Sequence, residues 1–251
     1  MISFRKVQVK TPQGKVLVHE TSFEVPKSTI VGLYGPNGSG KSSLLRTLAG
    51  QLSERDVSGE CWIEQTPIFQ SSVSISEKAR RVLYLGSDFQ TSFHVSVREL
   101  LDMAKHTNPK SNENGTEVAE KFGITKLLSR SFNEMSDGEK QRVMLARGVI
   151  QSPDWLILDE TFSKIDLDHS FHLVNELKNV VKKGKGIVLA SHDLNLISEF
   201  VDELWLMKDG KVVASGLIEE VLTSENMEKL YPNRIVHVVR SPDNGKKKVI
   251  Y

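Results

Sequence analysis

Apolar and polar residues alternate in two stretches near the start of the chain, residues 2–9 and residues 16–25. Alternation with a period of two is typical of a half-buried β-strand. Residues 11–14, which read Thr-Pro-Gln-Gly, separate the two stretches and favour a turn. We therefore expect the chain to begin with two antiparallel strands.

Short runs that are mostly apolar lie at residues 29–34, 155–158 and 187–190, and residues 57–85 also have a strand-like pattern. From about residue 95 to residue 150 the spacing of the apolar residues becomes that of helices. Apolar strands separated by helices are typical of a mostly parallel sheet that helices cover on both faces. We therefore predict the α/β fold class.

The composition limits the function classes to consider. The 251 residues contain 33 Lys and Arg, 32 Asp and Glu, and one Cys. A net charge of +1 argues against a strongly basic nucleic-acid binder. One cysteine excludes a disulfide framework and a cysteine-rich metal site. The lysines at residues 246–248 are expected to be a solvated charge run. The length suffices for one large α/β domain, or for a domain with an inserted lobe.

The hydropathy of the chain bears on its location. No stretch approaches the roughly 18 consecutive apolar residues that a membrane-spanning helix needs. The first residues, Met-Ile-Ser-Phe-Arg-Lys, reach charged side chains too early for a secretory signal. We expect the chain to stay in a reducing cytoplasm, where any work at a membrane depends on a partner.

The first candidate site is a glycine-rich segment. Residues 35–42 read Gly-Pro-Asn-Gly-Ser-Gly-Lys-Ser and match G-x-x-x-x-G-K-[ST] in full, between an apolar strand and a helix. Glycines let backbone N–H groups point at phosphate oxygens, and the helix adds its positive end. Lys41 would contact the β- and γ-phosphates, and Ser42 would bind Mg²⁺. The candidate nucleotide-binding residues are Gly35, Pro36, Asn37, Gly38, Ser39, Gly40, Lys41, Ser42 and Ser43.

A second candidate site follows the apolar run at residues 155–158, which leads into Asp159 and Glu160. Ligands of an open α/β sheet bind beyond the carboxyl ends of its strands, so these acids should face the same crevice as the glycine-rich segment. Adjacent residues leave a strand on opposite sides, which suits two tasks. We expect Asp159 to hold Mg²⁺ through water, and Glu160 to orient and polarise an attacking water molecule.

A third signal precedes that strand, where residues 133–142 open an amphipathic helix. Ser136 and Glu139 have the S-x-x-E spacing of a capping box, which accounts for Ser136 without any ligand. The capping box does not account for Gly138, a poor helix former in the first turn. A glycine here would let a phosphate approach the end of the helix.

Residues 135–139, Met-Ser-Asp-Gly-Glu, resemble the signature motif LSGGQ of ABC ATPases. The order of phosphate loop, signature and acidic strand is also similar to that family. The resemblance implies a P-loop NTPase core with a mostly parallel sheet, an antiparallel β subdomain and an inserted α-helical subdomain. It implies one ATPase domain in residues 1–232, with the helical subdomain at about residues 88–150, and a C-terminal tail in residues 233–251.

The resemblance also implies roles for single residues. Two ATPase subunits would face each other head to tail, so that the phosphate loop of one and the signature of the other enclose each ATP. Asp166 stands at the place of the D-loop aspartate. His192 matches the switch histidine, which would bond the γ-phosphate and help to hold Glu160 and the water. The signature residues that would face the partner's ATP are Ser136, Asp137, Gly138 and Glu139.

The sequence departs from the family pattern at several positions. Thr11 and Pro12 stand where an aromatic residue usually stacks on adenine. Ser87 occupies the Q-loop position, where a glutamine amide usually reaches Mg²⁺ and the water. A serine is too short for this unless a water molecule bridges the gap. Residues 161–162 read Thr-Phe where Pro-Thr is usual, which alters the turn after the acidic pair.

The predicted function is that of an ATP-hydrolysing subunit of an ABC transporter, with ATP and Mg²⁺ as cofactors and a membrane permease docked near residues 87–104. Residues 97–100, 189–195 and 202–206 resemble subunits of importers for iron–siderophore complexes, haem or cobalamin. The expected partners are a second ATPase subunit in a homodimer, the permease and, indirectly, a solute-binding protein, but no nucleic acid. The chain would be cytoplasmic and peripheral, held on the inner face of the membrane by the permease.

Two alternatives stay open. An exporter ATPase is one, because a residue other than glutamine after Tyr-Leu-Gly is familiar in exporters. A soluble ABC ATPase that acts on nucleic acid or in assembly is the other. Such proteins usually carry a long coiled-coil insertion or a second ATPase half, and this chain has neither.

Overall fold

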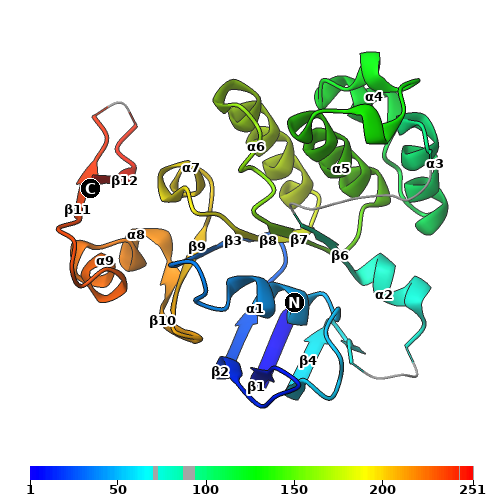
Figure 1. Cartoon of the computed structure of the whole chain (residues 1–251). Helices are drawn as coiled ribbons and strands as arrows, with labels where there is room; N and C mark the ends of the chain where they lie inside the picture. The colour runs from blue at the N-terminus through cyan, green and yellow to red at the C-terminus, as the bar shows by residue number, and fades with distance from the viewer. Residues whose placement is uncertain (70–72, 87–93, 243, 251) are drawn as a thin grey trace.

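The computed structural model describes residues 1–69, 73–86, 94–242 and 244–250 of the chain. Among these residues, six strands form a central sheet: β3 (Ile30–Tyr34), β6 (Val82–Leu85), β7 (Trp155–Asp159), β8 (Gly186–Ala190), β9 (Glu203–Lys208) and β10 (Lys211–Leu217). Their order is β10-β9-β3-β8-β7-β6 (Figure 1). All neighbours are parallel except β10, which pairs antiparallel with β9 at one edge. The predicted mostly parallel sheet is confirmed.

A second sheet holds the start of the chain. Its strands are β1 (Ile2–Lys10), β2 (Val16–Val25), β4 (Val57–Ile63) and β5 (Thr66–Pro67), in the order β2-β1-β4-β5. The strands β1 and β2 pair antiparallel, so the predicted antiparallel start is confirmed. The ring centroid of Phe23 lies 4.6 Å from that of Phe4 and 4.2 Å from that of Trp205 in β9. These aromatic contacts join the two sheets.

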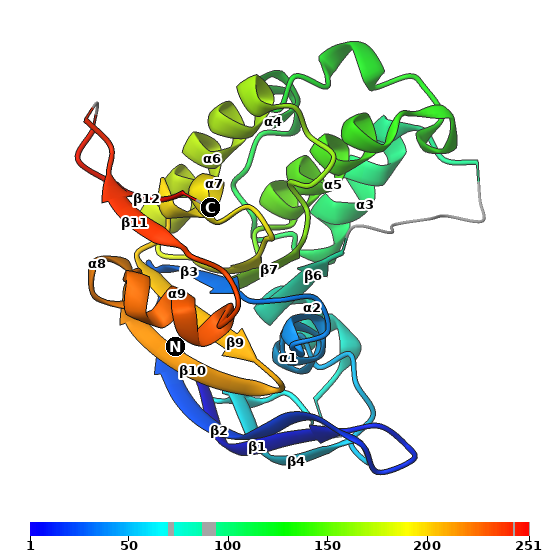
Figure 2. The ribbon, with the colours of Figure 1, turned by 60° about the vertical axis from the view of Figure 1, so that its left-hand side comes forward.

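The helix α1 (Lys41–Leu48) lies between the two sheets (Figure 2). Its side chains Leu44 and Leu48 are completely buried, in a cluster that also contains Phe4 of the antiparallel sheet and Ile157 of the central sheet. Burial of such side chains is the main stabilising contribution to a fold. Because α1 begins where the glycine-rich segment ends, this packing holds that segment at the carboxyl end of β3.

Further helices cover the other face of the central sheet (Figures 1 and 2). They are α3 (Val97–Thr107), α4 (Gly115–Lys121), α5 (Asp137–Gln151), α6 (Leu167–Lys182) and α7 (Leu194–Ser198), with short 3₁₀-helices at Thr125–Leu127 and Phe132–Glu134. Leu156 and Leu158 of β7 pack into the cluster on this face, whereas Ile157 packs on the α1 side. The predicted helical cover on both faces is confirmed. No helix in the described part of the chain is long and apolar enough to span a membrane.

One element differs from the prediction. The strand-like pattern of residues 57–85 predicts no helix, but Ile75–Arg81 form α2. Ser74 caps this helix, because its Oγ accepts a hydrogen bond from the N–H of Glu77 at 3.1 Å. None of its residues is buried, and Ile75 is 88% exposed. The prediction is wrong here because a cap starts the helix, whereas the analysis of periodicity detects only an apolar face.

The chain ends in two short helices and a hairpin. These are α8 (Ile218–Val221), α9 (Ser224–Leu230), β11 (His237–Arg240) and β12 (Lys247–Ile250). The side-chain amide of Asn195 in α7 donates to the carbonyl oxygen of Val249 at 3.1 Å and accepts from its N–H at 2.8 Å. The hairpin is therefore fastened to the helix that follows His192.

The lysines at residues 246–248 are engaged by other side chains and by backbone. Lys247 Nζ donates to the carbonyl oxygen of Leu222 at 2.9 Å. Lys246 and Lys248 place their Nζ atoms 3.6 and 3.7 Å from carboxylate oxygens of Glu199. The side chains of Lys246 and Lys248 are still 39% and 41% exposed, so this charge run is partly solvated and also contacts the ends of α7 and α8.

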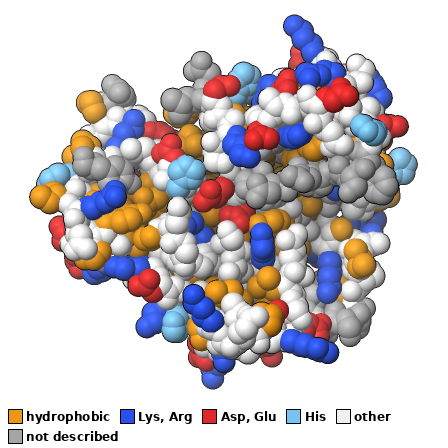
Figure 3. Space-filling view, viewed as in Figure 1, with side chains coloured by type: hydrophobic (Ala, Val, Ile, Leu, Met, Phe, Trp, Pro, Cys, Tyr) orange, Lys and Arg blue, Asp and Glu red, His pale blue; other side chains and the backbone are white. Residues whose placement is uncertain are grey.

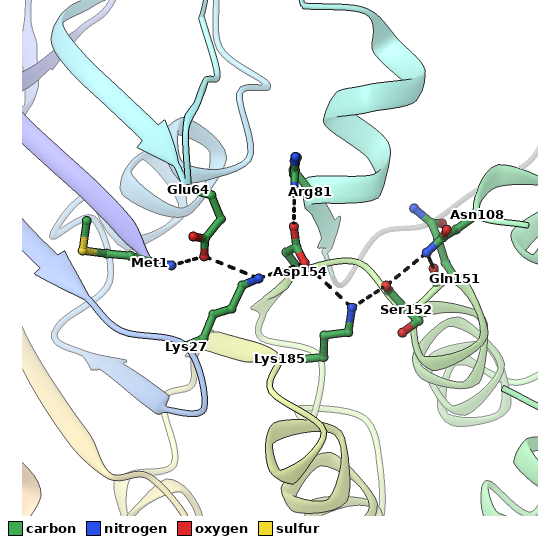
Figure 4. Close-up of polar contacts among 9 residues, drawn as sticks. All are labelled: Met1, Lys27, Glu64, Arg81, Asn108, Gln151, Ser152, Asp154 and Lys185. Carbon is green, nitrogen blue, oxygen red and sulfur yellow. Dashed lines mark hydrogen bonds and ion pairs between the residues drawn. The ribbon is translucent and has the colours of Figure 1, made fainter. Parts of the chain in front are cut away.

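An ion network lies at the end of the central sheet opposite the glycine-rich segment (Figure 4). Asp154 directly precedes β7 and accepts hydrogen bonds from Lys27 Nζ at 3.0 Å and from Arg81 Nη1 at 2.8 Å. Lys185 directly precedes β8, and its Nζ lies 3.8 Å from the same carboxylate. Glu64 lies 3.4 Å from Lys27 and also contacts the amino terminus. The network thus joins the starts of β6, β7 and β8.

We expect Asp154→Asn to lower the free energy of unfolding by about 1–3 kcal/mol at pH 7, because the surrounding cations lose their shared carboxylate. Burial raises the pKa of Asp154, but the hydrogen bonds from Arg81 and Lys27 outweigh it and leave the pKa below its usual range. A carboxyl group with a lowered pKa stabilises the fold above its unfolded-state pKa, about 3.9, and loses this effect as the pH falls through the folded-state value.

Urea denaturation of the wild type and of Asp154→Asn, from pH 7 to below about pH 4, measures the difference in unfolding free energy. The difference in unfolding free energy should narrow as the pH falls below about 4. Asp102→Asn, at an exposed position of α3, is the matched control and should change little. A difference that stays constant with pH, or an equal loss in the control, would contradict the assignment.

Candidate active site

The glycine-rich segment, residues 35–40, connects the carboxyl end of β3 to α1. A Cβ on Gly35 would lie 1.9 Å from the carbonyl oxygen of Met207, and a Cβ on Gly40, whose φ is +100°, would lie 2.5 Å from another backbone carbonyl. At Gly38, whose φ is +78°, a Cβ would meet no described atom within 4 Å. The segment is thus packed against its neighbours at both ends, while space adjoins its tip at Gly38.

Lys41, the first residue of α1, is buried with 6% of its surface exposed. Its Nζ donates to the carbonyl oxygens of Gly35 at 2.8 Å and Pro36 at 3.1 Å, so the ammonium group lies within the curve of the loop. Burial lowers the pKa of Lys41, and the nearby charges of Glu160 and Asp159 oppose this shift. A cation held in this way is suited to bind the oxygens of a polyphosphate.

Asp159 ends β7, two strands away from β3 in the central sheet, and is 6% exposed. Its Oδ2 accepts a hydrogen bond from the hydroxyl group of Tyr84 at 2.7 Å. Its Oδ1 is buried and has no hydrogen-bond partner among the described residues. A buried carboxylate oxygen without a partner is costly unless a cation or water satisfies it. Asp159 therefore fits a magnesium ligand.

Glu160 adopts a left-handed backbone conformation, with φ of +53°. Its N–H donates to the carbonyl oxygen of Ala190 at the end of β8, at 3.0 Å. Its carboxylate is about one-third exposed, and His192 Nδ1 lies 3.5 Å from its Oε2. Left-handed conformations at non-glycine residues cost of order 1–3 kcal/mol and cluster at functional sites. The strained turn and the histidine together set the position of this carboxylate.

The structure therefore brings the predicted residues of the phosphate loop and of the acidic strand to one edge of the sheet. Lys41 follows β3, Asp159 and Glu160 end or follow β7, and His192 follows β8. Because β3, β8 and β7 are adjacent and parallel, their carboxyl ends meet at this edge. The arrangement can hold a triphosphate, a divalent cation and an attacking water molecule.

The signature segment lies at the start of α5. Ser136 is its N-cap: the N–H of Glu139 donates to Ser136 Oγ at 3.3 Å, and the N–H of Ser136 donates to Glu139 Oε2 at 2.9 Å. The predicted capping box is confirmed. Ser136 and Asp137 are exposed, so this end of α5 is accessible to a second molecule.

Gly138 is required by a contact that the sequence does not reveal. A Cβ on Gly138 would lie 2.8 Å from the carbonyl oxygen of Lys164. The N–H of Lys164 donates to Gln141 Oε1 at 3.3 Å, and its Nζ donates to Asp137 Oδ2 at 2.9 Å. Lys164 thus holds the start of α5 against the segment that leads to Asp166.

Asp166 is exposed and caps α6, since its Oδ1 accepts from the N–H of His169 at 2.9 Å. Among the departures from the family pattern, Thr161 is buried, and its Oγ1 donates to the carbonyl oxygen of Leu85 at 3.3 Å. Phe162 packs against Phe200 with ring centroids 6.1 Å apart. These residues anchor the turn after Glu160 in place of the usual Pro-Thr.

Ser87, the predicted Q-loop residue, lies outside the described residues. Thr11 and Pro12 lie after β1, where the N–H of Thr11 donates to the carbonyl oxygen of Lys15 at 2.8 Å in the predicted turn. Sequence reasoning missed Tyr84 and Lys164 as site residues. Tyr84 could have been found from the sequence, because it lies in a strand beside the acidic strand. No sequence pattern marks Lys164.

Comparison with known proteins identifies the family. A family model described as "ABC transporter" matches residues 18–163. The chain belongs to the ABC transporter family. The "Hemin import ATP-binding protein HmuV" of Escherichia coli O157:H7 is 36% identical over 97% of this chain and 96% of that protein. The protein of the same name from Pseudoalteromonas translucida is 31% identical over 92% of each chain.

Solved structures of ABC transporter subunits share the fold. "Structure of ATP binding subunit of ABC transporter" matches with a TM-score of 0.81 and 21% identity, covering 92% of this chain and 98% of that chain. "Dimeric Structure of MJ0796, a Bacterial ABC Transporter Cassette" matches with a TM-score of 0.73 and 18% identity, over 87% and 99%. The predicted α/β fold and the predicted family are confirmed. As a member of this ABC transporter family, the chain is an ATP-binding ATPase subunit.

Proposed function

We propose that this ATPase powers the import of haem or a related iron chelate through a membrane permease. ATP hydrolysis is supported by one observation: four residues meet at the same edge of the central sheet, namely Lys41, Asp159, Glu160 and His192. The cargo class is supported by relatives over most of the chain that are named as hemin import proteins, one of them 36% identical. Haem is the proposed cargo, and iron–siderophore complexes and cobalamin are the alternative cargoes that the uptake experiment tests.

The chemical role of each residue follows from its position. Backbone N–H groups around Gly38 and the ammonium group of Lys41 bind the β- and γ-phosphates. Ser42 and Asp159 hold Mg²⁺, which when bound neutralises charge on the phosphate oxygens. The buried, unpartnered Oδ1 of Asp159 supports this assignment.

Glu160 orients the water molecule that attacks the γ-phosphate. The His192 side chain, 3.5 Å away, holds the Glu160 carboxylate and contacts the γ-phosphate. In-line attack requires the water to stay close to the phosphorus atom, and a positioned carboxylate supplies this orientation.

A second copy of the chain completes each site. The exposed Ser136 and Asp137, followed by Gly138 and Glu139, lie at the N-terminus of α5, where backbone N–H groups and the helix dipole attract an anion. In a head-to-tail homodimer Ser136 and Gly138 contact the γ-phosphate bound by the partner, and Asp166 lies at the interface. ATP closes the dimer because the closed form binds it more tightly.

The permease docks near residues 87–104, of which the structure describes residues 94–104, and holds the chain on the inner face of the membrane. A solute-binding protein acts on the other side of the permease. Nucleic acid is not a partner. Lys and Arg side chains are interspersed with Asp and Glu on the face shown in Figure 3, consistent with a net charge of +1.

Purification from detergent-solubilised membranes, followed by transport in proteoliposomes, tests this proposal. We expect an integral membrane permease to be recovered with the chain. In proteoliposomes we expect ATP-dependent uptake of haem, and no uptake of cobalamin or of a ferric siderophore. Glu160→Gln in the same complex is the control and should abolish uptake. Recovery with ribosomes or DNA would reject a transport role, and transport of haem in the opposite direction would identify an exporter.

A further inference from the structure

The hydroxyl group of Tyr84 contacts the acid that we assign to magnesium. Tyr84 lies in β6, the strand beside β7, at the position paired with Ile157. Its hydroxyl donates to Asp159 Oδ2 at 2.7 Å and accepts from Arg46 Nε at 3.4 Å. Arg46 belongs to α1, the helix that begins at Lys41. One side chain therefore links the acidic strand, its neighbour and the helix that follows the phosphate loop.

The hydrogen bond from Tyr84 gives the two oxygens of the Asp159 carboxylate different environments. Oδ2 is occupied by Tyr84, whereas Oδ1 is buried and unpartnered among the described residues. A short hydrogen bond to a carboxylate restricts rotation of that group.

The ring of Tyr84 also packs closely against Gly86. A Cβ on Gly86 would lie 3.1 Å from Cε1 of the Tyr84 ring, which is tighter than most such contacts. Gly86 ends the described part of the chain before residue 87. Tyr84 therefore lies beside the backbone of Gly86 and contacts Asp159 through its hydroxyl group.

We propose that Tyr84 is a positioning residue that orients the Asp159 carboxylate, so that Oδ1 faces the magnesium bound with ATP. The proposal rests on the function proposed above. Residues that hold a metal ligand by its other atom typically contribute 10–100-fold to metal affinity. In this proposal Tyr84 is not itself a ligand and acts through its hydrogen bond to Asp159.

The test is Tyr84→Phe, which keeps the ring and its packing but removes the hydroxyl group. We expect Mn²⁺, used as a paramagnetic substitute for Mg²⁺ in the presence of ATP, to bind roughly 10-fold more weakly. Binding of ATP in EDTA and the melting temperature should stay close to those of the wild type. At saturating Mg²⁺ the hydrolysis rate should recover to within a few-fold, because the carboxylate itself is intact.

Two control variants are compared with Tyr84→Phe. Tyr231→Phe removes a hydroxyl group that lies 3.2 Å from Tyr34 Oη, away from Asp159, and should leave metal affinity unchanged. Asp159→Asn should weaken metal binding at least as much as Tyr84→Phe. Unchanged Mn²⁺ affinity in Tyr84→Phe would overturn the proposal, and so would an equal loss of ATP binding in EDTA, which would indicate a purely structural role. A wild-type protein whose ATP binding is not enhanced by metal would instead overturn the proposed function.

Discussion

Glu160→Gln should lower the rate of ATP hydrolysis by about 10²–10⁴-fold, the usual contribution of a positioned general base. Glutamine has the same shape and can keep the N–H bond to Ala190, so the turn at φ +53° should persist. ATP affinity should be equal or higher, because a negative charge near the γ-phosphate is removed. The variant should accumulate as an ATP-bound dimer. Phosphate release and light scattering with ATP measure the two effects.

The matched control for this experiment is Glu20→Gln, an exposed glutamate in β2. It removes the same charge away from the site and should leave both the rate and the oligomeric state unchanged. If Glu160→Gln hydrolyses ATP at close to the parental rate, Glu160 is not the key carboxylate. In that case the contact with His192 would be structural.

Lys41→Ala should weaken ATP binding by roughly 10–100-fold, because the triphosphate loses a charge-assisted hydrogen-bond donor. The side chain is buried and makes its bonds to the carbonyl oxygens of Gly35 and Pro36, so no other cation of the chain can replace it without rearrangement. Burial lowers the pKa of Lys41, with Glu160 and Asp159 opposing the shift, which is consistent with a desolvation cost for its charge in the fold. We therefore expect no fall in melting temperature. Calorimetric titration with ATP measures the affinity.

Lys182→Ala, at an exposed lysine that ends α6 on the side of the central sheet opposite the phosphate loop, controls for a general loss of positive charge. It should bind ATP as the wild type does. Unchanged affinity in Lys41→Ala would count against the assignment of residues 35–42 as the phosphate loop. A large fall in melting temperature would show that Lys41 has a structural role.

Much of the fold was predictable because it depends on short-range patterns. The alternation in residues 2–9 and 16–25 led to the antiparallel pair, and the apolar runs led to the central strands. The helix α2 escaped prediction because it buries no residue. Hydrophobic periodicity reports burial of an apolar face, and an exposed helix that a serine caps has no such face.

The parts of the candidate site that depend on short-range patterns could also be predicted from the sequence. The phosphate loop is a local motif, in which positive φ angles and a following helix set the geometry over a few residues. The capping box at Ser136 is likewise an i to i+3 interaction. Such motifs are visible in a sequence because their partners are neighbours in the chain.

Contacts between distant residues depend on the order of the strands, which no local pattern specifies. Tyr84 and Asp159 are 75 residues apart and meet because β6 is placed beside β7. Asp137 and Lys164 are 27 residues apart and are joined by a hydrogen bond. The carbonyl oxygen of Lys164, which leaves no room for a Cβ at residue 138, explains Gly138 better than helix propensity does. The amino-acid sequence thus specified which residues we propose for nucleotide binding. Packing of the sheet specified how those residues are held, since packing sums many weak contacts over the whole chain.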